Sequence, residues 1–265
     1  MAEPVELLQP VVDISRRAGE KILKIYATDF DVEHKDDESP LTAADLAAHH
    51  CIIDGLRELT PDIPILSEED GLPDFETRRS WKRYWIVDPL DGTKEFVQRN
   101  GDFTVNIALI EDGIAVLGVV HAPVHDASWF AAVGSGAWKQ EKNGPLDAIS
   151  TARVGDTQRI VASRNHRGEA VDALMERLPN ATDISVGSSL KLCMVAEGKA
   201  DLYPRLGPTS EWDTAAGQCV VEQAGGLVTT TDFLPLKYNS KDDILNPHFL
   251  VIGDPTFDWQ QYFPH

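Results

Sequence analysis

The sequence predicts an α/β protein built in layers, in which a helix pair and an antiparallel sheet precede a half where strands alternate with helices. Apolar residues recur every three or four positions near the N-terminus, as they do on one face of a helix. Short β-rich runs separated by Gly, Pro and Asp then occupy residues 63–133. With 265 residues, 42% of them hydrophobic, the chain suffices for one large domain or two small ones that share a core.

The first helix should begin near Pro4, and a second should begin at Thr42. Thr42 and Asp45 have the spacing of a capping box, in which two side chains satisfy free N–H groups at a helix start. The second helix should stop at Pro61, because proline cannot continue a helix. The first helix would bury one apolar face, formed by Leu7, Val11, Ile14, Ala18, Ile22 and Ile25.

A β-hairpin is predicted between two apolar runs, at the tight-turn sequence Glu111-Asp112-Gly113. The turn Asn143-Gly144-Pro145 marks a boundary. We therefore expect an N-terminal part, residues 1–150, with the helix pair and the antiparallel sheet, and a C-terminal α/β part, residues 151–265. In the second part the pattern predicts a strand at 160–162, helices at 169–178, 188–197 and 213–224, and strands at 227–230 and 249–252.

The net charge of −19, from 43 acidic and 24 basic residues, argues against nucleic-acid binding through a basic face. Three widely spaced cysteines form neither a zinc motif nor a disulfide framework. The N-terminal residues lack the features of a signal peptide, and no apolar run approaches the roughly 20 residues of a membrane helix. We expect a cytoplasmic protein without an integral membrane segment, with peripheral association to the inner membrane left open.

The segment WIVDPLDGTKEF, residues 85–96, has the strongest chemical signal. An apolar strand is expected to end at Asp88, where a proline forces a turn, and Asp91 follows three residues later. Two carboxylates on such a turn suit one or two divalent cations. The free N–H groups of Gly92 and Thr93, at the start of a helix, favour an anion such as phosphate. A capping Asp91 beside a solvated Asp88 would explain the same residues without function.

Two further acidic clusters flank this segment in the sequence. Residues 67–70, SEED, follow a predicted strand, and adjacent like charges destabilise one another unless they are solvated or neutralised. Residues 211–217, EWDTAAG, place Asp213 at a helix start, where capping alone could explain it. An exposed acidic turn and a helix cap are the simple alternatives for each cluster, but they do not explain why all three occur in one chain.

The three motifs, in this order and spread over nearly the whole chain, resemble the inositol monophosphatase superfamily of lithium-sensitive phosphatases. That superfamily pairs a D-P-[IL]-D-G-T turn with an upstream Glu-Glu and a downstream Trp-Asp. The resemblance implies a layered α-β-α-β-α sandwich of the inositol monophosphatase and fructose-1,6-bisphosphatase type. The surrounding sequences, DPLDGTKEFVQRNGDFTVNIALI and GSSLKLCMVAEGKADLYPRLGPTSEWDTAAG, are most similar to its 3'(2'),5'-bisphosphate nucleotidases.

This closer similarity implies a magnesium-dependent enzyme that hydrolyses 3'-phosphoadenosine 5'-phosphate (PAP) to AMP and phosphate in sulfur assimilation, as a monomer or homodimer. Two or three Mg²⁺ ions would be held mostly by the N-terminal part, with one ligand from the C-terminal part. The implied ligands are Glu68, Asp88, the backbone carbonyl of Leu90, Asp91 and Asp213, with Glu69 acting through water or supporting Glu68. Thr93 and Asp45 would orient and deprotonate the attacking water. The implied substrate contacts are Gly92, Thr93, Ser163, His166, Ser188, Lys191, Arg205 and Asp213.

Phosphate monoester hydrolysis requires neutralisation of charge on the attacking and leaving oxygens, which two metal ions can provide. Three Mg²⁺ ions would roughly balance six site carboxylates and invert the field that an anionic substrate meets. Inositol monophosphatase or fructose-1,6-bisphosphatase activity remains an alternative, although Lys94-Glu95-Phe96 favours the nucleotidase branch. An alternative of a different class is a non-catalytic module that binds divalent metal ions.

Overall fold

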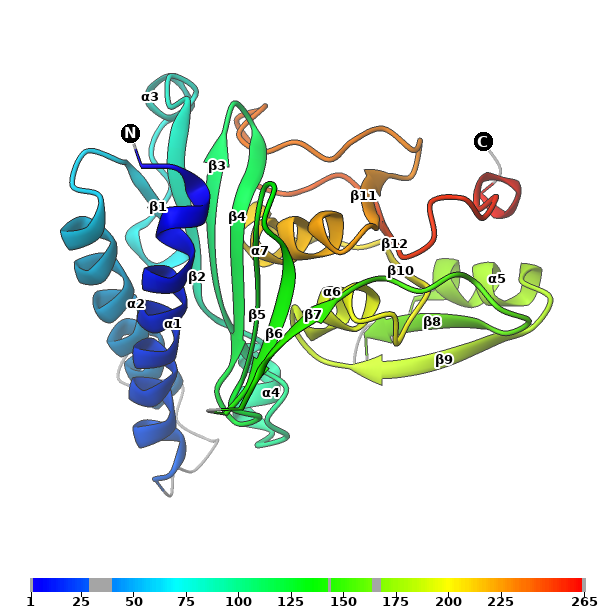
Figure 1. Ribbon diagram of the computed structural model, residues 1–265, viewed down its shortest axis with the longest axis horizontal. Coiled ribbons are helices and arrows are strands. Elements are labelled where there is room, and N and C mark those ends of the chain that lie inside the picture. Colours follow the sequence, from blue (N-terminus) through cyan, green and yellow to red (C-terminus); the bar gives the residue numbers. More distant parts are fainter. Residues whose placement is uncertain (1, 29–39, 143, 164–167, 264–265) are drawn as a thin grey trace.

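Five layers of alternating helices and sheets make up the structure, a computed structural model that describes residues 2–28, 40–142, 144–163 and 168–263. A helix pair, a seven-stranded sheet, two more helices, a five-stranded sheet and a last helix follow one another across the molecule (Figure 1). This arrangement confirms the predicted α-β-α-β-α sandwich.

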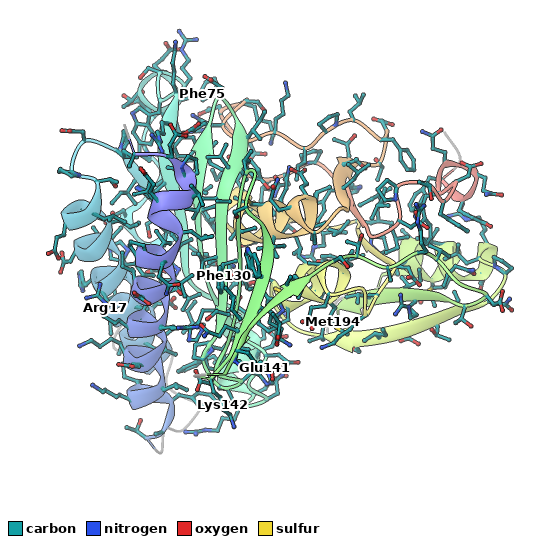
Figure 2. All side chains as sticks on the ribbon, viewed as in Figure 1. Arg17, Phe75, Phe130, Glu141, Lys142 and Met194 are labelled. Atoms are coloured by element: carbon teal, nitrogen blue, oxygen red, sulfur yellow. The ribbon has the colours of Figure 1, made fainter. Side chains whose placement is uncertain are left out.

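The outer helix pair consists of α1 (Pro4–Tyr26) and α2 (Pro40–Leu59). The predicted apolar face of α1 is buried against the first sheet, where Phe130 of β5 also packs (Figure 2). The helix α2 begins two residues before the predicted start, so the expected capping box at Thr42 and Asp45 is wrong. Proline suits a first helical position because its φ is already set. Neither these nor the other described helices are long and apolar enough to cross a membrane.

The first sheet has its seven strands in sequence order, and only its first two strands are parallel. Alternate residues face opposite layers: Trp85 and Val87 pack toward the outer helices, while Tyr84 and Ile86 pack toward the interior helices. The strands are β1 (Ile65–Ser67), β2 (Arg83–Asp91), β3 (Thr104–Glu111), β4 (Ile114–Ala122), β5 (Ala127–Ala132), β6 (Gly136–Glu141) and β7 (Leu146–Ile149). Short helices η1 (Glu68–Asp70), α3 (Phe75–Arg78) and α4 (Thr93–Val97) lie in the connections. The predicted hairpin joins β3 to β4.

The strand β2 does not end at Asp88 as predicted, but continues through Pro89 to Asp91. Its register with β3 shifts between Asp88 and Asp91. Because proline has no N–H to donate to a ladder, it fits in such an irregular step. The shift therefore keeps both aspartates on the last residues of a sheet strand instead of on a loop.

The second sheet has the strand order β11-β12-β10-β8-β9. Residues such as Val161 and Tyr203 face the interior helices, where Met194 of α6 also packs (Figure 2), while Ile160 and Leu202 face α5. The sequence prediction did not include β6, β7, β9 or the central strand β10, in which Pro204 lies. These elements are β8 (Gln158–Ser163), α5 (Glu169–Arg177), β9 (Ala181–Val186), α6 (Leu190–Ala196), β10 (Leu202–Arg205), α7 (Glu211–Gln223), β11 (Leu227–Thr230), β12 (Phe249–Ile252) and η2 (Gln260–Tyr262).

The interior helix α7 lies directly against β4 at Gly118. A Cβ atom added to this glycine would lie 2.2 Å from the carbonyl oxygen of Ala216, far closer than van der Waals contact allows. Only glycine therefore permits this approach. The contact places the helix that begins at Glu211 against the first sheet, so that its first turn can meet residues from the end of β2.

Candidate metal centre and active site

Three aspartates from distant parts of the chain converge where the two halves meet. Asp88 and Asp91 come from the end of β2, and Asp213 comes from the first turn of α7. Each offers a carboxylate oxygen, and these atoms all lie within 4.8 Å of one another. Asp88 is buried, whereas Asp91 and Asp213 are half-buried. Closely spaced carboxylate oxygens are ligands that Mg²⁺ prefers.

Two more acidic residues reach the cluster because β1 and β2 are parallel neighbours. Ser67 pairs with Val87, so the residues that follow them, Glu68 and Asp88, lie side by side. The Glu68 carboxyl group lies within hydrogen-bonding range of that of Asp88, a bond that forms when one of the two is protonated. Asp45, on α2, lies close enough to Glu68 and Glu69 for their charges to act on it.

The pKa values of four of these carboxyl groups are raised, because burial first and neighbouring like charges second disfavour the charged form. Burial, followed by Glu69 and Glu68, raises the pKa of Asp45 to about 8. Burial and Asp91 raise the pKa of Asp213 to about 7. Although Glu68 is an exposed residue, loss of solvent around its carboxyl group is the main cause that raises its pKa to about 6. The pKa of Asp88 lies well above its ordinary value, chiefly because of burial. A bound divalent cation would reverse this balance.

The backbone conformation at the end of β2 is held by hydrogen bonding and by packing. The Leu90 N–H donates to Oδ1 of Asp88 over 3.0 Å, and the Leu90 side chain is anchored in the core. Gly92 has a φ of +100°, a left-handed conformation that favours glycine. Thr93 then begins α4, which contacts α2, the helix that carries Asp45. No direct hydrogen bond joins Thr93 to Asp45 among the described residues, so their joint action on water remains a prediction.

Ser189 is a site residue that the sequence reasoning missed. Its backbone N–H and its hydroxyl both donate to Oδ2 of Asp91, over 2.6 Å and 2.8 Å. The available signal was its place directly after Ser188, in a segment that already resembled the nucleotidases. Nothing in the sequence paired Ser189 with an aspartate 98 positions earlier.

A polar cavity of about 130 Å³ opens beside the aspartates. The buried Lys191 lines it and donates from Nζ to the Ser188 carbonyl oxygen over 2.6 Å. Burial lowers the pKa of Lys191 to about 8. Gly92, Ser188, Arg205 and Asp213 line the same cavity, so the structure brings these predicted substrate contacts together. His166 and the side chain of Ser163 lie outside the described residues.

A second cavity, of about 270 Å³, adjoins the first. The two share Tyr203 and Arg205, while Val171 and Leu206 give the second cavity an apolar lining. A polar cavity and an apolar cavity thus lie side by side next to the acidic cluster.

His49 ties α2 to the turn that carries Glu68. This buried imidazole lies 2.9 Å from Ser67 Oγ through Nδ1, and 3.2 Å from Asp70 Oδ1 through Nε2. The two contacts bracket Glu68 and Glu69 in the sequence. His49 also follows Asp45 by one helical turn, so one face of α2 carries both residues toward the site.

Replacing His49 by alanine is expected to raise the Kd for Mg²⁺ by about tenfold, because loss of outer contacts commonly weakens metal binding by this order. Calorimetric titration of the metal-free protein with Mg²⁺ measures the change. The neighbouring His50 is exposed, which makes His50→Ala the matched control. Equal Mg²⁺ affinities for the two variants would show that His49 does not hold the Glu68 turn.

The sequence model of the inositol monophosphatase family matches residues 3–251. The chain is 50% identical over 249 residues to the 3'(2'),5'-bisphosphate nucleotidase CysQ of Escherichia coli O157:H7, covering 92% of this chain and 99% of that relative. It is 36% identical over 263 residues to CysQ of Haemophilus influenzae, covering 97% and 96%.

Two solved structures are also similar to this chain. CysQ from Bacteroides thetaiotaomicron superposes with a TM-score of 0.84 at 44% identity, covering 92% of this chain and 96% of that one. An inositol monophosphatase from Zymomonas mobilis has a TM-score of 0.77 at 24% identity, covering 95% and 92%. The second similarity concerns the fold alone.

Proposed function

Because the chain belongs to the inositol monophosphatase family, we propose that it is a 3'(2'),5'-bisphosphate nucleotidase that hydrolyses PAP to AMP and phosphate. One observation carries this proposal: near-full-length similarity to such nucleotidases coincides with a partly buried acidic cluster beside a cavity that Lys191 and Arg205 line. The cluster suits metal ions, and the basic side chains suit the phosphate of a substrate.

We assign two or three Mg²⁺ ions to Glu68, Asp88, Asp91 and Asp213, with the Leu90 carbonyl and Glu69 as further contacts. The donor set fits, because it consists of oxygen atoms, and because burial and neighbouring carboxylates raise the pKa values of Asp88 and Asp213, a cost that a bound cation would offset. When bound, Mg²⁺ acidifies water and neutralises charge on the oxygens of the reacting phosphate.

The residues of the chain supply the remaining functions. Asp45 accepts the proton of the attacking water, and Thr93 orients that water through its hydroxyl. Gly92 and Thr93 bind the reacting phosphate through backbone N–H groups. Lys191 and Arg205 bind the second phosphate, with Ser188 beside them. His166 and Ser163 remain predicted contacts of the nucleoside.

The pair of adjoining cavities favours a nucleotide over the alternative substrates. A phosphate in the polar cavity would place the attached nucleoside near the apolar cavity that shares Tyr203 and Arg205. A purine has an apolar face that such a lining can cover. Inositol 1-phosphate and fructose 1,6-bisphosphate have hydroxyl groups in place of that face. Contact with the apolar cavity would therefore contribute less to their binding free energy.

Phosphate release from PAP, its sulfated relative PAPS, inositol 1-phosphate and fructose 1,6-bisphosphate tests the proposal. We expect the highest kcat/KM for PAP, dependence on Mg²⁺, and inhibition by Li⁺. The Asp91→Asn variant, purified in parallel, controls for contaminating phosphatases. Preference for inositol 1-phosphate would overturn the substrate assignment but keep the chemistry. Absence of release from every substrate would favour the non-catalytic metal-binding module.

We propose further that residues 1–150 provide most metal ligands and that residues 151–265 provide Asp213 and the substrate contacts. We propose that the protein acts as a monomer or a homodimer. The cytoplasmic location remains a prediction from the sequence.

A further inference from the structure

We infer that Ser189 is a positioning residue of the metal centre, which orients the Asp91 carboxylate and links it to the backbone of Asp213 before any cation binds. The inference rests on the proposed function only in taking Asp91 as a metal ligand. It assigns to Ser189, in the C-terminal part of the chain, an effect on the metal ligand Asp91, in the N-terminal part.

The two donors of Ser189 meet the same carboxylate oxygen. Its N–H and hydroxyl lie 2.6 Å and 2.8 Å from Oδ2 of Asp91, and Ser189 itself is only 2% exposed. Among the described residues no hydrogen bond reaches Oδ1 of Asp91. The carboxylate is therefore held through one oxygen, and the other is left for a cation.

The Ser189 hydroxyl also lies 2.7 Å from the Asp213 carbonyl oxygen. A hydroxyl has one hydrogen, so it serves Asp91 or Asp213 at a given moment, while the backbone N–H always serves Asp91. This shared donor joins the ends of β2 and α7, the two elements that provide the three clustered aspartates.

Asn106 on β3 determines which way the hydroxyl hydrogen points. Its Nδ2 donates to Ser189 Oγ over 2.9 Å, and its Oδ1 accepts from Thr104 Oγ1 over 3.0 Å. The amide thus occupies a lone pair of Ser189 Oγ, which leaves the hydroxyl to act as donor toward Asp91 and Asp213. Both Thr104 and Asn106 are buried in the first sheet, so this support is rigid.

The backbone before Ser189 is held in an uncommon conformation. Ser188 has a φ of +51°, in the left-handed region that non-glycine residues seldom adopt. Its side chain lies 2.6 Å from Thr104 Oγ1, and its carbonyl accepts from Lys191 Nζ over 2.6 Å. Contacts on both sides therefore fix the bend that directs the Ser189 N–H at Asp91.

Calorimetric titration of the metal-free Ser189→Ala protein with Mg²⁺ tests the inference without any substrate. We expect a Kd about tenfold higher than that of the unmodified protein, the lower end of what loss of such supporting contacts usually causes, since the backbone N–H remains. The matched control is Ser15→Ala, because Ser15 is also buried and donates to a carbonyl, that of Val12, far from the site. At saturating Mg²⁺, kcat of Ser189→Ala should recover.

The Asn106→Ala variant provides a second route to the same answer. If Asn106 acts through Ser189, the double variant should bind Mg²⁺ no more weakly than Ser189→Ala alone. A Kd for both single variants equal to that of Ser15→Ala would overturn the inference. Because these measurements use Mg²⁺ alone, they remain valid if PAP proves not to be the substrate.

Discussion

Replacing Asp88 by asparagine is expected to lower kcat/KM for PAP by about 10³-fold or more while raising the melting temperature of the metal-free protein. Metal ions supply several kcal/mol of charge stabilisation, and each 1.36 kcal/mol changes a rate tenfold. Asp88 lies at the centre of the cluster, so its loss affects every ion bound there. The same buried carboxyl group is repelled by Asp91, Glu68 and Asp213 when no cation is present.

Asparagine preserves the local geometry at this position. Its side-chain oxygen can still accept from the Leu90 N–H, and its amide can donate to the Glu68 carboxyl group. Phosphate release and thermal unfolding in EDTA measure the two effects. The control is Asp254→Asn, since Asp254 is buried away from the site, accepts a hydrogen bond from the Val154 N–H and has a lowered pKa. That variant should lose stability but keep its affinity for Mg²⁺. If Asp88→Asn kept wild-type turnover, the metal assignment would be wrong.

The metal-free protein is expected to lose stability as the pH rises from about 5 to 8, and Mg²⁺ is expected to remove this loss. The ordinary pKa values of the site carboxyl groups are 3.8 to 4.5, while the folded values for Glu68, Asp213 and Asp45 are about 6, 7 and 8. Between these limits the folded state keeps protons that the unfolded state has released. The contribution of these groups to the free energy of unfolding is therefore fully present below their pKa values in the unfolded chain. It is lost as the pH rises through their pKa values in the folded protein.

The expected size of this effect is large. For Asp213, a shift from 3.8 to about 7 corresponds to about 4 kcal/mol at 1.36 kcal/mol per pKa unit. Bound Mg²⁺ needs the carboxylates deprotonated, so it should stabilise the protein more as the pH rises. Chemical unfolding at pH 5, 6.5 and 8, in EDTA and in Mg²⁺, measures both trends. A metal-free stability that is flat or rises over this range would contradict the described carboxyl cluster.

The metal ligands could be predicted from the sequence because they are acidic residues that lie in short, recognisable motifs. Asp88 and Asp91 lie three residues apart on one strand end, and Glu68 directly follows a strand. The residues that support them could not be predicted in this way. Ser189 and His49 act through hydrogen bonds to residues that only the folded chain brings close to them. In the sequence, one precedes a helix and the other lies within a helix, and neither position indicates a metal site.

Two of the errors in the predicted fold arise at prolines. Pro89 was expected to end a strand by forcing a turn, yet it occupies a register shift within β2. Pro40 begins α2 earlier than the capping pattern at Thr42 suggested. At Pro89 the missing N–H falls in a register shift, and at Pro40 it falls at a helix start, and both features depend on neighbours that a linear pattern does not show.

Gly118 has no functional group, yet the accuracy of metal coordination depends on it. The depth at which α7 lies against β4 sets the height of Asp213 above the end of the first sheet. Metal–ligand distances tolerate errors of only about 0.2 Å, whereas a side chain at Gly118 would displace the helix by more than that. A side chain at Gly118 is therefore expected to weaken coordination of the metal ions as well as the stability of the fold.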